Sequence, residues 1–334
     1  MIFDLPLIWA VIIAFAVFMY VFMDGFDLGI GILFPFAPDD NARTRMMTTI
    51  APVWDANETW LVLGGGGLFA AFPIAYAIVM PAVYIPVTVM LIALIFRGVA
   101  FEFRHSAVAS RRWWDRSFHI GSLVATLSQG FVLGAFVQGF ELSGRHYGGG
   151  PFDWLTLFSA MTAIALVFGY ALLGATWVIV KTTDALRDWA YGLVRRLLLG
   201  VVLFIGAVSL WTPFLAPSIA ERWFSWPNIL YLSPVPLLTA ALLAVLLWAV
   251  RARRDAVPFV CTLGLFALCY LGLGISLWPL AVPPALSIWD VAAAPSSQAF
   301  MLAGTVIVIP LVLIYTAYSY WVFRGKVAGD GGYH

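Results

Sequence analysis

The sequence predicts an all-α polytopic membrane protein with nine transmembrane helices and no separate soluble domain. Of its 334 residues, 63% are hydrophobic and only 10% are charged, whereas soluble domains carry about 25% charged residues. Apolar stretches recur along the whole chain with short polar links, so residues 1–334 are predicted to form a single integral membrane domain. The formal net charge of +1 gives no electrostatic reason to expect a nucleic-acid partner.

Each predicted span rests on length and composition, because a helix needs about 20 apolar residues, at a rise of about 1.5 Å each, to cross a bilayer. The second and third spans are divided only by Pro73 and its neighbours. The first four residues lack the basic segment of a cleaved signal peptide, so the first helix is expected to be retained. In chain order the spans are 6–36, 51–74, 77–101, 118–140, 155–180, 197–216, 228–250, 257–279 and 298–323.

The basic residues set the predicted orientation, since Lys and Arg gather in the cytoplasmic loops of membrane proteins. With nine spans, Arg97 lies inside a span, and Arg145 and Arg222 fall on one side of the membrane. We therefore predict that the N-terminus lies outside, in the periplasm, and that the C-terminus is cytoplasmic. The other side receives Arg43, Arg45, Arg104, Arg111, Arg112, Arg116, Lys181, Arg187, Arg195, Arg196, Arg251, Arg253, Arg254, Arg324 and Lys326.

Carboxylates occur inside the first two spans, where a charged side chain costs about 2.5 kcal/mol or more. Asp24 and Asp27 are three residues apart in the first span, so they share one face of the helix. Asp55 and Glu58 have the same spacing in the second span. The predicted orientation places all four in the cytoplasmic half of the membrane.

The third span ends with Arg97 and Glu102, so ionisable groups from three successive helices are expected to meet at one depth. One interpretation is a structural network in which Arg97 pairs with carboxylates and holds the helices in register. The other is a proton path leading inward from the cytoplasm. One arginine cannot neutralise five carboxylates, so some must be protonated or hydrated. The residues leave both interpretations open, and the two can coexist.

Two other features of the second span invite a functional interpretation. Trp54 and Trp60 flank its acidic face and could line a groove for a quinone or a lipid, although packing is the simpler explanation. The run Gly64–Gly67 predicts close packing against a neighbouring helix, because small residues let helix backbones approach each other in lipid. It does not resemble a phosphate-binding loop, because no Lys followed by Ser or Thr comes after it.

The histidines argue against a haem in this chain. His105, His146 and His334 fall in predicted loops or in the tail, and His119 lies at the start of a predicted helix. None lies in the middle of a span, where a histidine ligand of a b-type haem would be expected. The sequence also lacks paired His or Cys motifs, so we predict neither haem nor metal bound directly by this chain.

These residues resemble a known family, subunit II of the cytochrome bd-type quinol oxidases of bacteria. The similarity extends from the first span to the last. The matching motifs are Asp24–Gly29, Ala51–Trp60, Gly67–Pro73, Phe96–Arg104, Gly174–Thr176, Trp289–Asp290 and Tyr315–Trp321.

The resemblance implies a partner, a larger subunit I that carries the b-type haems, haem d or a substitute haem b, and the quinol-oxidising loop. The complex would sit in the bacterial inner membrane, oxidise quinol outside, reduce O2 to water and take its protons from the cytoplasm. For this chain, the resemblance implies two four-helix bundles plus one peripheral helix. Some members also bind a ubiquinone, and a small accessory subunit can be present.

The resemblance also bears on single residues. Acids that match Asp24, Asp27 and Asp55 lie near a proton route in the family. Glu58 stands where some relatives have an amide, which is similar to the cyanide-insensitive branch, whose members are also short like this chain. The additional carboxylate could join the route or only pair with Arg97.

Two other classes of function fit some of the same features. A secondary transporter would also place carboxylates inside the membrane, but it should show inverted repeats with broken helices, and Gly64–Gly67 has no counterpart in the second half. A scaffold subunit without a proton role would use the same acids and Arg97 only to hold helices together.

Overall fold

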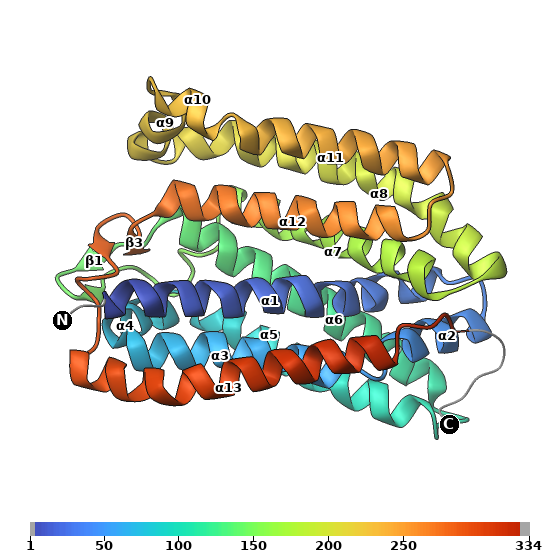
Figure 1. Ribbon diagram of the computed structural model, residues 1–334. Helices are drawn as coiled ribbons and strands as arrows, with labels where there is room; N and C mark the ends of the chain where they lie inside the picture. The colour runs from blue at the N-terminus through green and yellow to red at the C-terminus, as the bar shows by residue number, and fades with distance from the viewer. Residues whose placement is uncertain (1–3, 328–334) are drawn as a thin grey trace.

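The computed structural model describes residues 4–327, and it shows a bundle of long helices that run side by side along one axis (Figure 1). The start of the first helix and the end of the last lie at opposite ends of this bundle. Within the described residues, eight helical segments are long and apolar enough to cross a membrane. They are Leu5–Phe36, Tyr84–Arg104, Arg111–Gln138, Leu157–Lys181, Asp184–Phe214, Asn228–Arg251, Ala256–Leu277 and Pro295–Val322.

The full set of elements is almost entirely helical. Two short antiparallel hairpins, β1 (Leu142–Ser143) with β2 (His146–Tyr147) and β3 (Leu280–Val282) with β4 (Leu286–Ser287), lie at one end. Short 3-10 turns extend α1 and α8. The helices are α1 (Leu5–Leu33), α2 (Asp40–Ile50), α3 (Trp54–Ala71), α4 (Pro73–Ala82), α5 (Tyr84–Arg104), α6 (Arg111–Gln138), α7 (Leu157–Lys181), α8 (Asp184–Trp211), α9 (Pro217–Phe224), α10 (Asn228–Leu232), α11 (Pro234–Arg251), α12 (Ala256–Leu277) and α13 (Pro295–Val322).

The predicted second and third spans differ most from the structure. Helix α3 occupies the place of the second span, but its first turns carry Asp55, Asn57 and Glu58, so it is not among the eight apolar segments. The predicted third span is two helices, α4 and α5, which are separated at Val83. The sequence pattern missed this break because every residue around it is apolar.

Several helices also begin before the predicted spans. Helix α6 begins at Arg111 and α8 at Asp184, well before the predicted starts at 118 and 197. The sequence analysis counted only apolar residues, whereas a helix can continue beyond the bilayer into a polar layer. Helix α2 was not predicted at all, and its first turn is capped by Asp39, which accepts a hydrogen bond of 2.7 Å from the Ala42 backbone N–H.

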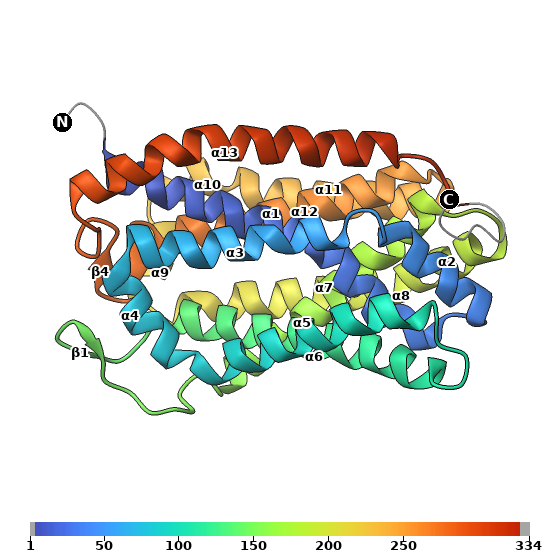
Figure 2. The same cartoon turned by 90° about the horizontal axis from the view of Figure 1, so that it is seen from below.

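The helices pack in two sets that meet where α7 packs on both α1 and α6. Helices α1, α3, α5 and α6 pack together, with α5 against α6 and α1 against both α3 and α6. Helices α7, α8, α11 and α12 form the other set. Helix α13 lies on the outside of the first set, where it contacts α1 and α3 (Figure 2). The buried apolar core extends across both sets and includes Leu28, Ile30, Leu172 and Val178.

The crossing of α1 and α7 is close because glycines face each other there. A Cβ atom on Gly29 would lie 1.9 Å from the backbone oxygen of Tyr170. A Cβ atom on Gly174 would lie 2.5 Å from the backbone carbonyl carbon of Gly29. The predicted close packing of Gly64–Gly67 holds in part: Gly64 and Gly67 lie against Val17 and Ile13 of α1, whereas Gly65 and Gly66 have no atom of the chain near a Cβ position.

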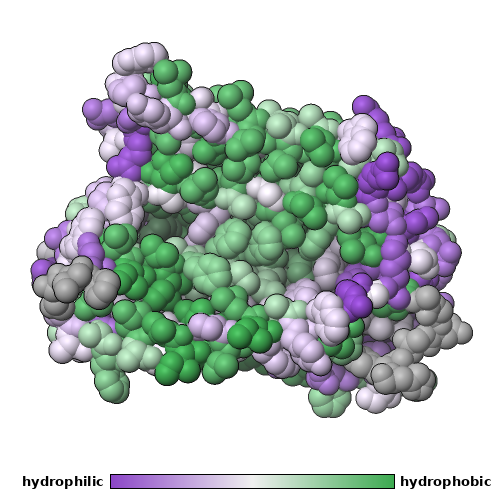
Figure 3. Space-filling model, in the orientation of Figure 1, coloured by the Kyte–Doolittle hydropathy of each residue, from purple (hydrophilic) through white to green (hydrophobic). Residues whose placement is uncertain are grey.

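The polar residues gather at one end of the bundle. Helix α2, the α5–α6, α7–α8 and α11–α12 links and the end of α13 all lie there (Figures 1 and 2). In Figure 3 this end is strongly purple, a green apolar belt crosses the middle of the face, and purple and pale residues return at the opposite end. Arg145 and Arg222 belong to the β1–β2 turn and α9, at the opposite end.

The segment after α13 is fixed across this polar end. Lys326 Nζ lies 2.5 Å from Asp255 Oδ2, and the Val327 backbone N–H donates a 2.7 Å hydrogen bond to the Lys181 backbone oxygen. Partial burial by itself would raise the pKa of Asp255, but the hydrogen bonds from Lys326 and Tyr191 outweigh it and lower that pKa below its usual value. The last helix is thereby attached to the second helix set at its polar end.

We expect Gly174→Ala and Gly29→Ala to destabilise the protein by about 1–3 kcal/mol each, because the added methyl group would meet backbone atoms that cannot turn aside. Gly206→Ala in α8 is the matched control, since its Cβ would meet nothing within 4 Å. The measurement is the thermal unfolding midpoint in detergent. Equal midpoints for all three variants would show that the α1–α7 contact tolerates an extra methyl group.

Candidate functional site

Asp24 and Asp27 lie in the interior of the helix bundle. Both side chains are fully buried on α1, and both face the first helix set. Asp24 Oδ1 lies 3.3 Å from Arg97 Nη2 on α5. Asp27 Oδ2 accepts a hydrogen bond of 2.7 Å from the Asn57 Nδ2 group on α3. The two acids predicted to share a helix face therefore meet different partners from two neighbouring helices.

Arg97 connects three helices. Its side chain is 1% exposed, and it forms ion pairs with Asp24 of α1 and Glu58 of α3. Helix α6 packs tightly behind it, since a Cβ on Gly121 would lie 3.1 Å from the Arg97 backbone nitrogen. The Trp54 ring lies 6.0 Å from the guanidinium carbon. Arg97, Asp24, Asp27 and Glu58 form what we call the acid cluster.

Asn57 extends the acid cluster to the last helix. Its side-chain oxygen accepts a 3.0 Å hydrogen bond from the Tyr320 hydroxyl of α13, while its Nδ2 group donates to Asp27. Sequence analysis missed both residues. Asn57 stands inside the polar motif of α3 and could have been included on that ground. Tyr320 was noted only as part of the Tyr315–Trp321 motif, and nothing in its local sequence points to the interior.

A second polar chain begins one turn before Asp24. Tyr20 lies four residues before Asp24 on α1, and its hydroxyl accepts a 2.8 Å hydrogen bond from Gln129 Nε2 of α6. Gln129 Oε1 in turn accepts a 2.8 Å hydrogen bond from the Tyr170 hydroxyl of α7. No sequence motif marked these three residues, because they are far apart in the chain and meet only through helix packing.

The acid cluster contains more acceptors than donors. Both oxygens of Asp24, Oδ1 of Asp27 and two nitrogens of Arg97 are buried without an aligned hydrogen-bond partner within residues 4–327. The Asp24–Arg97 contact is thus a close charge pair and not an aligned hydrogen bond. One guanidinium balances one of the three carboxylates, and leaving the others charged would cost several kcal/mol each. This arrangement favours a cluster that holds exchangeable protons.

Two acids predicted for the same site lie outside the acid cluster. Glu102 was expected to meet Arg97 and the other acids at one depth, but it is exposed, and the ionic partners of Arg97 are Asp24 and Glu58. Five residues of helix place Glu102 on a different face of α5 from Arg97. Asp55 is exposed on the first turn of α3, one turn before Glu58, whose side chain is 26% exposed. Glu58 and Asp55 therefore lie between the buried acids and the surroundings of the bundle.

The tryptophans predicted to line a groove differ in burial. Trp60 is 1% exposed and packs edge-on against Phe15, with ring centroids 5.8 Å apart. Trp54 is half-buried and packs on Phe101 at 5.0 Å. Packing thus accounts for the position of Trp60, and a groove for quinone or lipid at this pair stays a prediction.

Arg104 organises a separate ionic network at the polar end. Its side chain is fully buried and contacts Asp115 at 2.6 Å, Asp40 at 2.8 Å and the Thr44 hydroxyl at 3.0 Å. Asp40 also pairs with Arg111. Sequence analysis counted Arg104 only as a basic loop residue, because the helix α2 that supplies two of its partners was not predicted.

Among the described histidines, His105 follows α5 and His146 lies in the β1–β2 hairpin, but His119 lies eight residues inside α6 and not at a helix start as predicted. His119 Nδ1 on α6 lies 3.0 Å from the Gly31 backbone oxygen, and His105 and His146 are exposed. Partial burial and the neighbouring Arg104 lower the pKa of His105. His334 lies outside the described residues. Residues 4–327 contain no group of three His, Cys, Asp or Glu side chains that could hold a metal ion.

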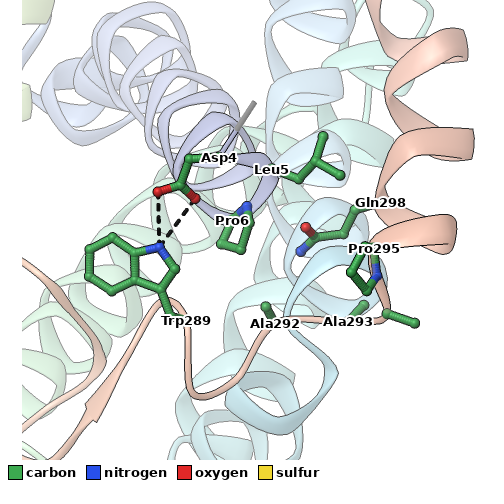
Figure 4. A pocket seen from close by; sticks show the side chains of 9 residues that line it. Asp4, Leu5, Pro6, Trp289, Ala292, Ala293, Pro295 and Gln298 are labelled. Atoms are coloured by element: carbon green, nitrogen blue, oxygen red, sulfur yellow. Dashed lines mark hydrogen bonds between the residues drawn. The ribbon is translucent and has the colours of Figure 1, made fainter. Parts of the chain in front are cut away.

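A cavity of about 500 Å³ lies at the opposite end from α2, where α1 begins (Figure 4). The Trp289 indole N–H points at the Asp4 carboxylate and donates to it at 3.0–3.1 Å. Gln298 is buried beside it and donates to the Ala71 backbone oxygen. This cavity is far from the acid cluster along α1, so the buried charges and this open space are separate features.

Comparisons with known proteins agree on one family. The model of the family described as cytochrome bd terminal oxidase subunit II matches residues 5–323. The chain is 27% identical to cytochrome bd-I ubiquinol oxidase subunit 2 of Escherichia coli strain K12, over 98% of this chain and 96% of the relative. It is 29% identical to the probable cytochrome oxidase subunit 2 of Haemophilus influenzae, over 97% of this chain and 95% of the relative.

Two further comparisons concern proteins of Bacillus subtilis and Geobacillus thermodenitrificans. Cytochrome bd ubiquinol oxidase subunit 2 of Bacillus subtilis is 27% identical, over 96% of each chain. A chain in the structure of the bd oxidase from Geobacillus thermodenitrificans superposes with a TM-score of 0.71 at 19% identity, covering 95% of this chain and 99% of that one. At this low identity, the structural likeness shows a shared fold.

We expect Arg97→Ala to lower the stability of the protein by about 3–5 kcal/mol, because it leaves buried carboxylates without their cation. The control is Arg112→Ala, which removes an exposed arginine near the start of α6. Thermal unfolding in detergent and the yield of folded protein are the measurements. An Arg97→Ala protein as stable as the control would mean that the cluster does not depend on this cation.

Proposed function

The chain belongs to the cytochrome bd terminal oxidase subunit II family, and from this membership we propose that it supports proton uptake in a two-subunit quinol oxidase. The family is a subunit of a terminal quinol oxidase, an oxidoreductase complex of the bacterial inner membrane whose subunit I carries the haems. The proposed complex oxidises quinol outside and reduces O2 to water. This chain would contribute stability and acids that carry protons from the cytoplasm.

The observation that carries this proposal is the excess of buried carboxyl groups over cations. Asp24 and Asp27 are fully buried, and Arg97 is their one close cation among residues 4–327. A purely structural network would be expected to balance its charges. Carboxyl groups that exceed the available positive charge can take up and release protons, which is what a relay needs.

The proposed route begins where the carboxyl groups become accessible. Asp55 is exposed at the start of α3, and Glu58 is partly exposed and paired with Arg97. Asp24 and Glu58 both contact Arg97, which brings their carboxyl groups into one charge cluster along the proposed route. Asp27 lies one turn further along α1 and is held by Asn57. The acid cluster is closer to the polar end than to the hairpin end, which fits uptake from that side.

The proposed arrangement in the membrane extends the eight apolar segments to nine spans. Helix α3 would be the ninth, because Gly64 and Gly67 pack on α1 between its polar first turns and its apolar end. The two helix sets would be the two four-helix bundles, with α13 peripheral. Since the polar end holds most of the Lys and Arg residues, we place it in the cytoplasm and the N-terminus in the periplasm.

The cofactor assignments are proposals of the same kind. We propose that the haems are held by subunit I and none by this chain, because among the described histidines only His119 lies inside a helix, and its Nδ1 atom lies against the Gly31 backbone oxygen. A ubiquinone or lipid beside Trp54 and Trp60, a small accessory subunit, and cyanide insensitivity linked to Glu58 remain proposals that rest on the family. The same cluster could also serve only to hold α1, α3 and α5 together, since Arg97 contacts all three.

We expect Asp24→Asn and Asp27→Asn to lower the quinol-dependent O2 reduction rate of the purified complex by about tenfold or more, because an amide cannot relay a proton. Haem content should stay close to that of the unmodified complex. Asp55→Asn should have a smaller effect, since the exposed position is reachable by water. Steady-state oxygen uptake and visible spectra are the measurements.

The control for these variants is Asp39→Asn, which keeps a capping side chain at the start of α2. A loss of haem in parallel with activity would show that the acids are structural. Unchanged turnover in both Asp24→Asn and Asp27→Asn would remove them from the proton path.

We expect a tagged form of this chain, purified from its native membranes, to bring down a larger subunit with b- or d-type haem absorption bands. The preparation should catalyse quinol-dependent O2 uptake. The measurements are a reduced-minus-oxidised visible spectrum and oxygen consumption. A chain that purifies alone and colourless in mild detergent would contradict the oxidase assignment and favour a transporter.

A further inference from the structure

A cavity of about 250 Å³ opens at the polar end, between the start of α8 and the end of α11. Helix α8 packs mainly on α7, and α11 packs mainly on α12, so the seam between α8 and α11 is only lightly packed. In Figure 1 both helices run along the top of the bundle, with α11 in front of α8. The lining residues are Asp188, Tyr191, Gly192, Arg195, Val250 and Arg253.

Two arginines give this cavity its positive charge. Arg195 is exposed, and within residues 4–327 it makes no hydrogen bond or ion pair. Arg253 lies with its guanidinium carbon 4.8 Å from the centre of the Tyr191 ring and pairs with Asp188 through one nitrogen. Asp188 balances one of the two positive charges, and Arg195 leaves the other unbalanced. An arginine offers a planar set of donors that matches the oxygens of a phosphate group.

The cavity lies at the boundary between polar and apolar surface. On the same face of α8 as Arg195, the next turns carry Leu199 and Val202, which are 63% and 41% exposed. On α11, Leu247 is exposed one turn before Val250. The exposed apolar surface thus directly adjoins the charged residues of the cavity. A water occupies about 30 Å³ in the liquid, so the cavity has the volume of about eight waters and could hold a phosphate group.

We propose that this cavity binds the phosphate group of an anionic phospholipid, with Arg195 and Arg253 as its ligands and the acyl chains along Leu199 and Val202. Basic pockets between transmembrane helices on the cytoplasmic side suit such headgroups. Arg195 leaves one positive charge available to an anion at this cavity. A soluble phosphate shares this chemistry, but it has no acyl chains that could contact the adjoining apolar surface. This proposal does not depend on the proton path.

The test uses the purified two-subunit complex after removal of its lipids by detergent. Dioleoyl phosphatidylglycerol is added back, and its retention is measured by native mass spectrometry. Dioleoyl phosphatidylcholine is the neutral lipid with the same chains, and inorganic phosphate is the soluble anion. Retention should weaken about fivefold for each arginine removed in Arg195→Gln and Arg253→Gln, and about 25-fold in the double variant.

Arg112→Gln is the matched control, because it removes an exposed arginine from the same end of the molecule but away from the cavity. It should leave retention unchanged. Gly192→Leu keeps both arginines and fills the space, since a Cβ there would meet nothing within 4 Å. Loss of phosphatidylglycerol in Gly192→Leu would support the cavity even if an arginine variant assembles poorly.

The outcomes separate the sources of the phosphate. Retention of phosphatidylglycerol over phosphatidylcholine that depends on both arginines supports the lipid. Displacement of phosphatidylglycerol by millimolar inorganic phosphate alone supports the phosphate site but assigns it to a soluble anion. Equal retention of both lipids, or unchanged retention in the double variant and in Gly192→Leu, would overturn the proposal.

Discussion

The buried guanidinium of Arg97 is the interaction on which the first helix set depends. It lies between α1 and α3, contacts carboxylates of both and is backed by α6 at Gly121. A cation at this depth is stable only with anionic partners, and the carboxylates are stable there only with a cation. The positions of three helices are thereby coupled, because moving any one of them would separate buried charges in a medium that cannot solvate them.

The sequence could predict this coupling but not all of its members. Asp24 and Asp27 were identifiable because they interrupt an apolar stretch, and Arg97 because it is the one basic residue inside a span. Glu102 was assigned wrongly, since spacing along the chain does not say which face of α5 is occupied by its neighbours. Tyr320 could not be found, because its contact with Asn57 is set by how α13 lies across α3.

The fold, like the acid cluster, is predictable from the sequence in its apolar helices but not in the features that depend on contacts between helices. Hydropathy located the long apolar helices, since a helix needs about 20 apolar residues to cross the bilayer. It could not find the break at Val83, which is apolar on both sides, or α2, whose partner Arg104 lies far along the chain. It also placed the start of α8 too late, because Arg187 and Arg195 belong to a helix that continues beyond the apolar layer.

A structural network and a proton relay make different demands on the same residues. In a structural network, Arg97, Asp24 and Glu58 would keep fixed charges and hold helices together. In a relay the carboxyl groups must exchange protons, and Asp27 is best placed to do so, because among residues 4–327 it has no ion pair with Arg97 and its Oδ1 atom is buried without a partner. The Tyr320 hydroxyl donates to Asn57 Oδ1, which turns the Asn57 Nδ2 group toward Asp27. A residue of the peripheral helix thus orients the donor that stabilises Asp27 when it is ionised, and fixed and exchangeable charges lie side by side in one cluster.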